Sequence, residues 1–158
     1  MRILLDANVL LDLFLARTPW DVDAKTIWNL HLTGHVEAFV CAITPDNLHY
    51  IIRKEKAKQV GSDPSQQQVS LQFAHQVISE VVTTLLVAPV DKSILQAAVA
   101  LNWKDFEDAI HSACATEMAL DAIVTRDKKG FQSPSVQIFQ PDELLNFLAS
   151  QYPEPPRN

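Results

Sequence analysis

The sequence has little cysteine and no long uninterrupted run of apolar residues. Its two cysteines, Cys41 and Cys114, form neither a CxxC pair nor a Cys/His metal-ligand spacing, and both lie in apolar stretches. This pattern indicates buried free thiols and no need for an oxidising compartment. The apolar start of the chain is interrupted at Asp6, which argues against a signal peptide or a membrane span there. We therefore expect a cytoplasmic protein without a membrane partner.

The chain also lacks a strong excess of one charge. It has 13 Lys and Arg against 19 Asp and Glu, a formal net charge of −6. This balance argues against a broad electrostatic binder of nucleic acid, but not against an enzyme that holds nucleic acid through metal ions and a few local cations. A chain of 158 residues fits one domain at roughly 100–200 residues per domain. We expect a single domain over residues 1–150 and a flexible tail over residues 151–158.

Short apolar segments alternate with segments of helical spacing along the chain. We expect strands at residues 2–5, 37–43, 86–90, 122–125 and 136–139, and helices at residues 24–32, 47–58, 69–85, 93–101, 105–120 and 141–150. Thr44 and Pro45 suit the N-cap and first position of the second helix, and residues 60–68 are the most loop-like stretch. This alternation predicts an α/β fold with a central, mostly parallel sheet.

Two carboxylates follow predicted strands. Asp6 ends the first strand in MRILLDANVLLDLF, and Asp127 follows the fourth in IVTRDKKGF. An isolated buried carboxylate is costly unless it is paired, hydrogen-bonded or bound to a metal. Because functional sites form at the carboxyl ends of parallel strands, we expect Asp6 and Asp127 to converge. Asp127 also suits a simple turn before Lys128.

The segment WKDFEDAIHSACA carries further acids at the start of a predicted helix. If Asp105 is the N-cap, Asp108 lies three residues later on the same face. Asp105 has two interpretations, a helix cap or a site residue. Asp108 lies beside apolar residues, which favours a site, whereas Glu107 is expected to point into solvent.

Carboxylates that meet at one point repel each other, and a divalent cation relieves this repulsion. Oxygen ligands without a Cys/His cluster suit Mg²⁺ or Mn²⁺. Such a site can activate water and stabilise in-line displacement at phosphorus. We therefore expect Asp6, Asp108 and Asp127 to bind the metal and Asp105 to assist catalysis.

A likeness to a known family is carried by four segments: LLDANVLLDLF, ITPDNLHYIIRK, DFEDAIHSACA and IVTRDKKGF. In this order and spacing they resemble a PIN domain, most closely the bacterial VapC-like branch, from Arg2 to about Leu148. The resemblance implies a three-layer α/β/α sandwich and a Mg²⁺- or Mn²⁺-dependent ribonuclease. Many such proteins are toxins of toxin–antitoxin pairs and commonly dimerise. It therefore implies an RNA substrate, a small antitoxin protein and a homodimer.

The resemblance also assigns residues. It makes Asp6, Asp108 and Asp127 the first, third and fourth family acids, and Asp105 an additional acid. Asn8 and Thr44 match supporting polar positions. The second acid of the family aligns with Asn47, whose amide can ligate but has no charge and cannot act as a base; Asp46 is the neighbouring substitute. A catalytically weakened PIN-like binding or regulatory module is therefore the alternative function.

Several side chains have an RNA-binding or interface interpretation beside a structural one. Arg126 and Lys128 could contact RNA phosphates or lie in a solvated turn. The cations at 53, 54, 56 and 58 could form an RNA track or a solvated helix face. Phe14, Trp20 and Trp28 are candidates for a dimer interface. A haloacid-dehalogenase-like phosphatase would also begin with a strand that ends in aspartate, but its second aspartate is replaced here by Asn8.

Overall fold

The centre of the fold is a parallel sheet with the strand order β3-β2-β1-β4-β5. The structure is a computed structural model and describes residues 1–60, 63–132 and 134–151. The strands are β1 (Arg2–Leu5), β2 (Glu37–Cys41), β3 (Leu86–Ala88), β4 (Ala122–Val124) and β5 (Gln137–Phe139). Each neighbouring pair is parallel. The central strands are aliphatic and buried on both faces, as parallel sheets require.

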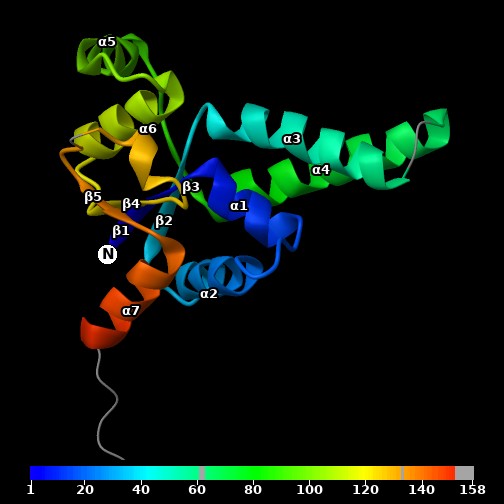
Figure 1. Cartoon of the computed structure of the whole chain (residues 1–158), viewed down its shortest axis with the longest axis horizontal. Helices are drawn as coiled ribbons and strands as arrows, with labels where there is room; N and C mark the ends of the chain where they lie inside the picture. The colour runs from blue at the N-terminus through cyan, green and yellow to red at the C-terminus, as the bar shows by residue number, and fades with distance from the viewer. Residues whose placement is uncertain (61–62, 133, 152–158) are drawn as a thin grey trace, which may run out of the picture.

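Helices cover both faces of the sheet. They are α1 (Ala7–Phe14), α2 (Asp21–Leu32), α3 (Thr44–Val60), α4 (Pro64–Thr84), α5 (Lys92–Leu101), α6 (Phe106–Glu117) and α7 (Pro141–Gln151), with a short 3-10 helix, η1 (Lys128–Gly130). One apolar cluster joins α1, α2, α3, α4 and α7 to one face, and a second joins α5 and α6 to the other. Figure 1 shows these layers. The predicted three-layer α/β/α fold with a parallel sheet is confirmed.

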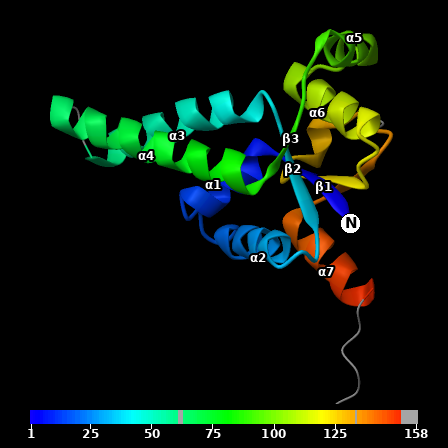
Figure 2. The ribbon, with the colours of Figure 1, turned by 180° about the vertical axis from the view of Figure 1, so that it is seen from behind.

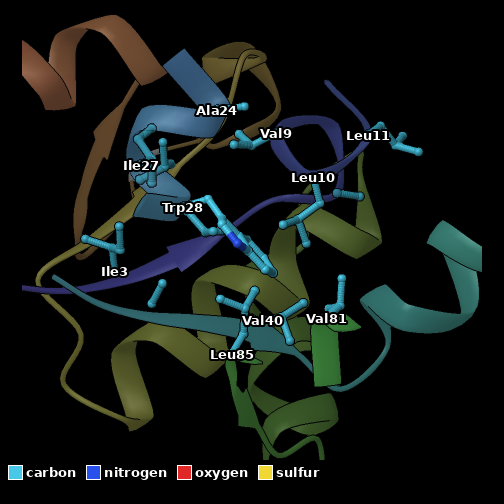
Figure 3. Packing of buried hydrophobic residues seen from close by; sticks show 14 of the residues in the cluster. Ile3, Val9, Leu10, Leu11, Ala24, Ile27, Trp28, Val40, Val81 and Leu85 are labelled. Atoms are coloured by element: carbon cyan, nitrogen blue, oxygen red, sulfur yellow. The ribbon is translucent and has the colours of Figure 1, made fainter. Parts of the chain in front are cut away.

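The first cluster packs around Trp28 (Figure 3). Its indole lies among Leu10, Val40 and Val81, and only 8% of the residue is exposed. Its ring also meets Phe14 edge to face, with centroids 5.5 Å apart. Of the two interpretations of Trp28, core or interface, the structure supports the core, because its apolar surface is already covered within the chain. Trp20 remains 44% exposed.

Several predicted boundaries differ from the structure, and helix α1 over Ala7–Phe14 was not predicted. Helix α4 begins at Pro64, so most of the predicted loop over residues 60–68 is helical. Asp63 occupies the cap position and proline fits the first turn of a helix, which is a start signal within the apparent loop. Helix α3 includes Thr44 as its first residue, so Thr44 is not the predicted N-cap. Residues 61–62 and the predicted tail from residue 152 onward lie outside the described residues.

Helices α3 and α4 pack side by side and extend beyond the edge of the sheet (Figures 1 and 2). With 17 and 21 residues, they are roughly 25 and 30 Å long at 1.5 Å per residue. Helix α3 starts beside the sheet, so this arm leads away from the carboxyl edge of the strands. Within the described ranges, no helix is both long and apolar enough to span a membrane.

Candidate active site

The candidate site lies where β1 and β4 end beside each other. Leu5 is in register with Val124, so Asp6 and Thr125 follow neighbouring strands at one edge of the sheet. The Asp6 backbone N–H donates to the Val124 carbonyl at 3.0 Å. Asp6 is only 7% exposed. The topology therefore places this carboxylate at a fixed and nearly dry position.

Hydrogen bonds hold the Asp6 carboxylate. It accepts from the backbone N–H of Ala7 at 2.6 Å, where it caps α1, and from the Thr125 hydroxyl at 2.7 Å. The Asn8 side-chain amide also donates to it, while the Asn8 carbonyl oxygen accepts from the Arg126 backbone at 3.1 Å. These donors fix the orientation of the Asp6 carboxylate. Asn8 therefore links the Asp6 carboxylate to the Arg126 backbone, and its role in a functional site stays a prediction.

Thr125 connects two of the predicted acids. Its hydroxyl donates to Asp6 and accepts from the Asp127 backbone N–H at 3.0 Å. Asp127 in turn caps η1, accepting from the Lys129 backbone at 3.1 Å. Sequence reasoning missed Thr125, although a hydroxyl residue directly after a buried strand is a usable signal. Thr125 thus links Asp127 to Asp6. Asp127 is also a turn residue, as its structural interpretation predicted.

Asp108 lies directly against Gly130. A Cβ atom built on Gly130 would fall 1.7 Å from Oδ2 of Asp108, so the carboxylate occupies space that any other residue at position 130 would fill. Asp105 caps α6 and accepts from the backbones of Glu107 and Asp108 at 3.0 and 3.3 Å. The cap interpretation of Asp105 is therefore confirmed, and the same bonds fix Asp105 beside Asp108.

Electrostatics connect these acids. Burial raises the pKa of Asp108 to about 7, and the charges of Asp105, Asp6 and Asp127 act in the same direction, while His111 opposes them. Each of the other three predicted acids is therefore near enough to repel the Asp108 carboxylate. This is the behaviour of carboxylates gathered at one point.

The four aspartate side chains offer oxygen ligands, which suit a hard divalent cation. All the gathered groups are carboxylates, their mutual repulsion would be relieved by a cation, and Mg²⁺ usually keeps several waters beside one or two protein carboxylates. No three His, Cys, Asp or Glu side chains in the described part of the chain form a ready-made metal cluster. By their chemistry Asp6, Asp108 and Asp127 are the residues that would hold such a cation, directly or through water.

Comparison of the chain with models of known protein families agrees with this geometry. The model of the PIN domain family matches residues 2–129. The chain belongs to the PIN domain family. No curated protein sequence gives a match.

Solved structures show the same fold at low sequence identity. They include FitAcB from Neisseria gonorrhoeae (19% identity, TM-score 0.59, covering 88% of this chain and 97% of that one). VapBC2 from Rickettsia felis, bound to a DNA fragment from their promoter, is similar at 13% identity with a TM-score of 0.60, covering 89% and 98%. PAE2754 from Pyrobaculum aerophilum is similar at 20% identity with a TM-score of 0.58, covering 96% and 97%.

In this PIN domain the carboxylate of Glu107, on α6, lies beside Asn47 on α3. The Asn47 side-chain amide donates to both carboxylate oxygens of Glu107, at 2.9 and 3.1 Å. The expectation that Glu107 points into solvent is therefore wrong. Asp46 is exposed. A negative charge therefore lies beside Asn47, on Glu107 of α6, although position 47 itself carries no acid.

A buried layer lies behind Asp6. His111 is fully buried, with Nε2 3.1 Å from the Thr44 hydroxyl and Nδ1 3.8 Å from Oδ1 of Asp6. Burial lowers the pKa of His111, but the hydrogen bond with Cys41 and the charge of Asp6 outweigh it, so the pKa is raised. His111 thus lies between Thr44 and Asp6. Cys41 and Cys114 are buried free thiols, as predicted.

The predicted RNA contacts of this PIN domain are engaged within the chain. Nε of Arg126 lies 2.6 Å from Oδ2 of Asp12, close but not aligned for a hydrogen bond, and its guanidinium lies 4.3 Å over the Trp20 ring. Lys128 pairs with Glu143 at 2.7 Å. Asp12 was missed by sequence reasoning, although a carboxylate inside an apolar run needs a partner just as Asp6 does.

Proposed function

We propose that this PIN domain is a Mg²⁺- or Mn²⁺-dependent endoribonuclease that cleaves RNA phosphodiesters and acts as the toxin of a type II toxin–antitoxin pair. One observation carries the nuclease part of this proposal. The charges of Asp105, Asp6 and Asp127 add to burial in raising the pKa of Asp108, and Asp6 and Asp127 are linked through Thr125 where β1 and β4 end. Like charges gathered in a partly buried site have a clear use as ligands of a cation that binds phosphate.

The chain's own residues would prepare the site. Asp6 is fixed by Thr125 and Asn8, Asp127 is oriented through its backbone by Thr125, and Asp108 is held against Gly130. A bound Mg²⁺ or Mn²⁺ would supply an activated water and stabilise the charge of in-line displacement at phosphorus. The raised pKa of Asp108 means that, without a cation, this carboxyl holds a proton over part of the neutral range.

The position of Asn47 bears on the alternative of a weakened binding module. An amide there removes the charge that family members have, which favours loss of catalysis. The Glu107 carboxylate, held by Asn47 at 2.9 and 3.1 Å, restores a negative charge at the same corner. We therefore favour an active nuclease over a binding module.

The antitoxin and homodimer parts of the proposal come from resemblance. VapBC2 is a PIN-fold neighbour whose structure contains promoter DNA, which supports a partner protein that also binds DNA. Coexpression of the chain with a small protein encoded beside it, followed by copurification, tests the partner. Light scattering of the purified chain tests the homodimer.

RNA cleavage tests the nuclease itself. Purified wild type should cleave RNA in Mn²⁺, and EDTA should stop the reaction. Asp108→Asn should lower the rate at least ~10-fold, because it disturbs the metal site. Asp142→Asn, an exposed acid on α7, is the control and should retain full activity. Cleavage that persists in EDTA, or in Asp108→Asn to the same extent as wild type, would contradict the proposal.

A further inference from the structure

A groove lies between the two helices of the projecting arm. Its volume is about 620 Å³. Its lining includes Tyr50, Arg53 and Lys54 from α3 and Gln67 and Gln68 from α4. We call this the α3–α4 groove. It is separate from the acidic site and none of the predicted catalytic residues line it.

The lining of the α3–α4 groove is positive although the protein is acidic. Among the described residues that line it, Arg53 and Lys54 are cations and none is Asp or Glu, whereas the whole chain carries a formal net charge of −6. A second groove of about 410 Å³ includes Asp23 and Asp142 in its lining, and its Arg126 is paired with Asp12. The charge therefore selects the α3–α4 groove as the place for an anionic ligand.

Tyr50 adds an aromatic surface to these cations. It is 55% exposed, and Nζ of Lys54 lies 5.7 Å from its ring centroid. An exposed aromatic ring beside a cation is the arrangement on which proteins stack unpaired bases while binding the adjacent phosphates. The amides of Gln67 and Gln68 on the facing helix are suited to hydrogen bonds with base edges.

Helix α3 connects the groove to the acidic site. Asn47, which holds Glu107, is followed on the same helical face by Tyr50 and Lys54, three and seven residues later. At 1.5 Å per residue these positions lie roughly 4.5 and 10 Å along the axis from Asn47. The helix extends away from the sheet in both views (Figures 1 and 2). A nucleic-acid strand that passes the acidic site could therefore continue along α3 into the groove.

We propose that the α3–α4 groove binds single-stranded RNA, with a base stacked on Tyr50 and phosphates contacted by Arg53 and Lys54. The identity of this RNA as the substrate rests on the proposed nuclease function. An acidic peptide would satisfy the two cations but would make no stacking use of Tyr50. Duplex RNA has its bases already stacked and paired, so it cannot use the tyrosine either.

Fluorescence anisotropy with a short labelled oligouridylate tests the groove without cleavage. The full chain is used in EDTA, as wild type, Tyr50→Ala, Tyr50→Phe and Lys54→Gln, and Lys92→Gln on α5 is the control for loss of an exposed cation. Base stacking on an aromatic ring is worth about 1–3 kcal/mol, so Tyr50→Ala should weaken binding roughly 5- to 150-fold. Tyr50→Phe should bind within about 2-fold of wild type because it keeps the ring. Lys54→Gln should reduce the salt slope by about 0.7, and Lys92→Gln should not.

The outcomes separate the groove from the nuclease. Binding that depends on Tyr50 supports the groove whether or not Mn²⁺ then induces cleavage, and with cleavage Tyr50→Ala should raise KM at unchanged kcat. The groove proposal is overturned if wild type does not bind the oligouridylate, or if Tyr50→Ala binds as well as wild type. Equal binding of duplex RNA, or full displacement by a polyglutamate peptide at equal concentration, would also overturn it. Metal-dependent cleavage in any of these cases would leave the nuclease proposal standing.

Discussion

Asn47 on α3 donates its side-chain amide to both carboxylate oxygens of Glu107 on α6, at 2.9 and 3.1 Å. The pair joins helices from opposite faces of the sheet beside the acidic site. Asparagine, rather than an acid, fits this contact because a second carboxylate would face the first without a donor between them. The amide at this position is therefore matched to its neighbour and is not simply a lost acid.

This contact predicts the effect of restoring the acid. Asn47→Asp should lower the free energy of unfolding in EDTA by about 1–3 kcal/mol, because it replaces a hydrogen bond to a charged group with a like-charge contact. Urea unfolding measures the change, and Mn²⁺ should recover part of it. Asn29→Asp adds the same charge at an exposed position of α2 and should change stability by less than about 0.5 kcal/mol. Equal effects of the two variants would contradict the Asn47–Glu107 pairing.

Gly130 should be essential to the site for steric reasons. Gly130→Ala places a Cβ atom where Oδ2 of Asp108 lies, at 1.7 Å, so the carboxylate must move. We expect Mn²⁺ affinity to fall roughly 10- to 100-fold. Gly34→Ala is the matched control, because Gly34 has φ +77° and open space around its Cβ position. It should lower stability by about 1 kcal/mol with unchanged Mn²⁺ affinity. Unchanged affinity in Gly130→Ala would rule out Asp108 as a ligand in this orientation.

Asp108 also predicts a pH dependence of the metal-free protein. Its pKa is raised from 3.8 to about 7 by burial and by its acidic neighbours. Between these values the folded state binds a proton that the unfolded state has released. The contribution of Asp108 to stability therefore falls as the pH rises from about 4 to about 7.

Urea unfolding of wild type and Asp108→Asn in EDTA, at several pH values, measures this contribution. The free energy of unfolding of wild type should decline relative to the variant across that window, so that Asp108→Asn is the more stable protein above about pH 7. Mn²⁺ should remove the difference by favouring the ionised carboxylate. Parallel pH profiles would show that Asp108 does not titrate in this range.

Arg126 is predicted to act chiefly on stability. Its Nε lies 2.6 Å from the carboxylate of Asp12, which is almost wholly buried. Burial raises the pKa of Asp12, and the charge of Arg126 opposes this. Arg126→Gln should therefore cost about 3 kcal/mol or more of stability, because it leaves a buried charge without its partner. Arg126→Gln/Asp12→Asn should recover much of the loss. A variant that loses RNA affinity at unchanged stability would instead support the predicted RNA contact.

The convergence of Asp6 and Asp127 could be predicted from the sequence because it depends only on parallel strands ending at one edge. The helix-cap position of Asp105 could also be predicted, because this residue directly precedes an amphipathic helix. The four-segment resemblance covered nearly the whole chain, and the family match over residues 2–129 and the parallel sheet confirm the family and the fold class.

Contacts between elements could not be predicted in the same way. The Asn47–Glu107 pair requires the starts of α3 and α6 to lie side by side, which no local pattern encodes. The burial of Trp28 depends on how α1 and α2 pack on the sheet. The start of α4 at Pro64 was hidden because its polar glutamines look like a loop, although they are adequate helix formers. Asp12 carried a usable signal, a charge within an apolar run, but its partner lies far along the chain.

Calorimetric titration with Mn²⁺ tests the central claim most directly. Wild type and the control Asp142→Asn should bind Mn²⁺ with similar affinity, and the double variant Asp6→Asn/Asp108→Asn should show no binding in the same concentration range while remaining folded by circular dichroism. Binding that is unchanged in the double variant, or absent from wild type, would show that these carboxylates are not the metal ligands of a PIN nuclease.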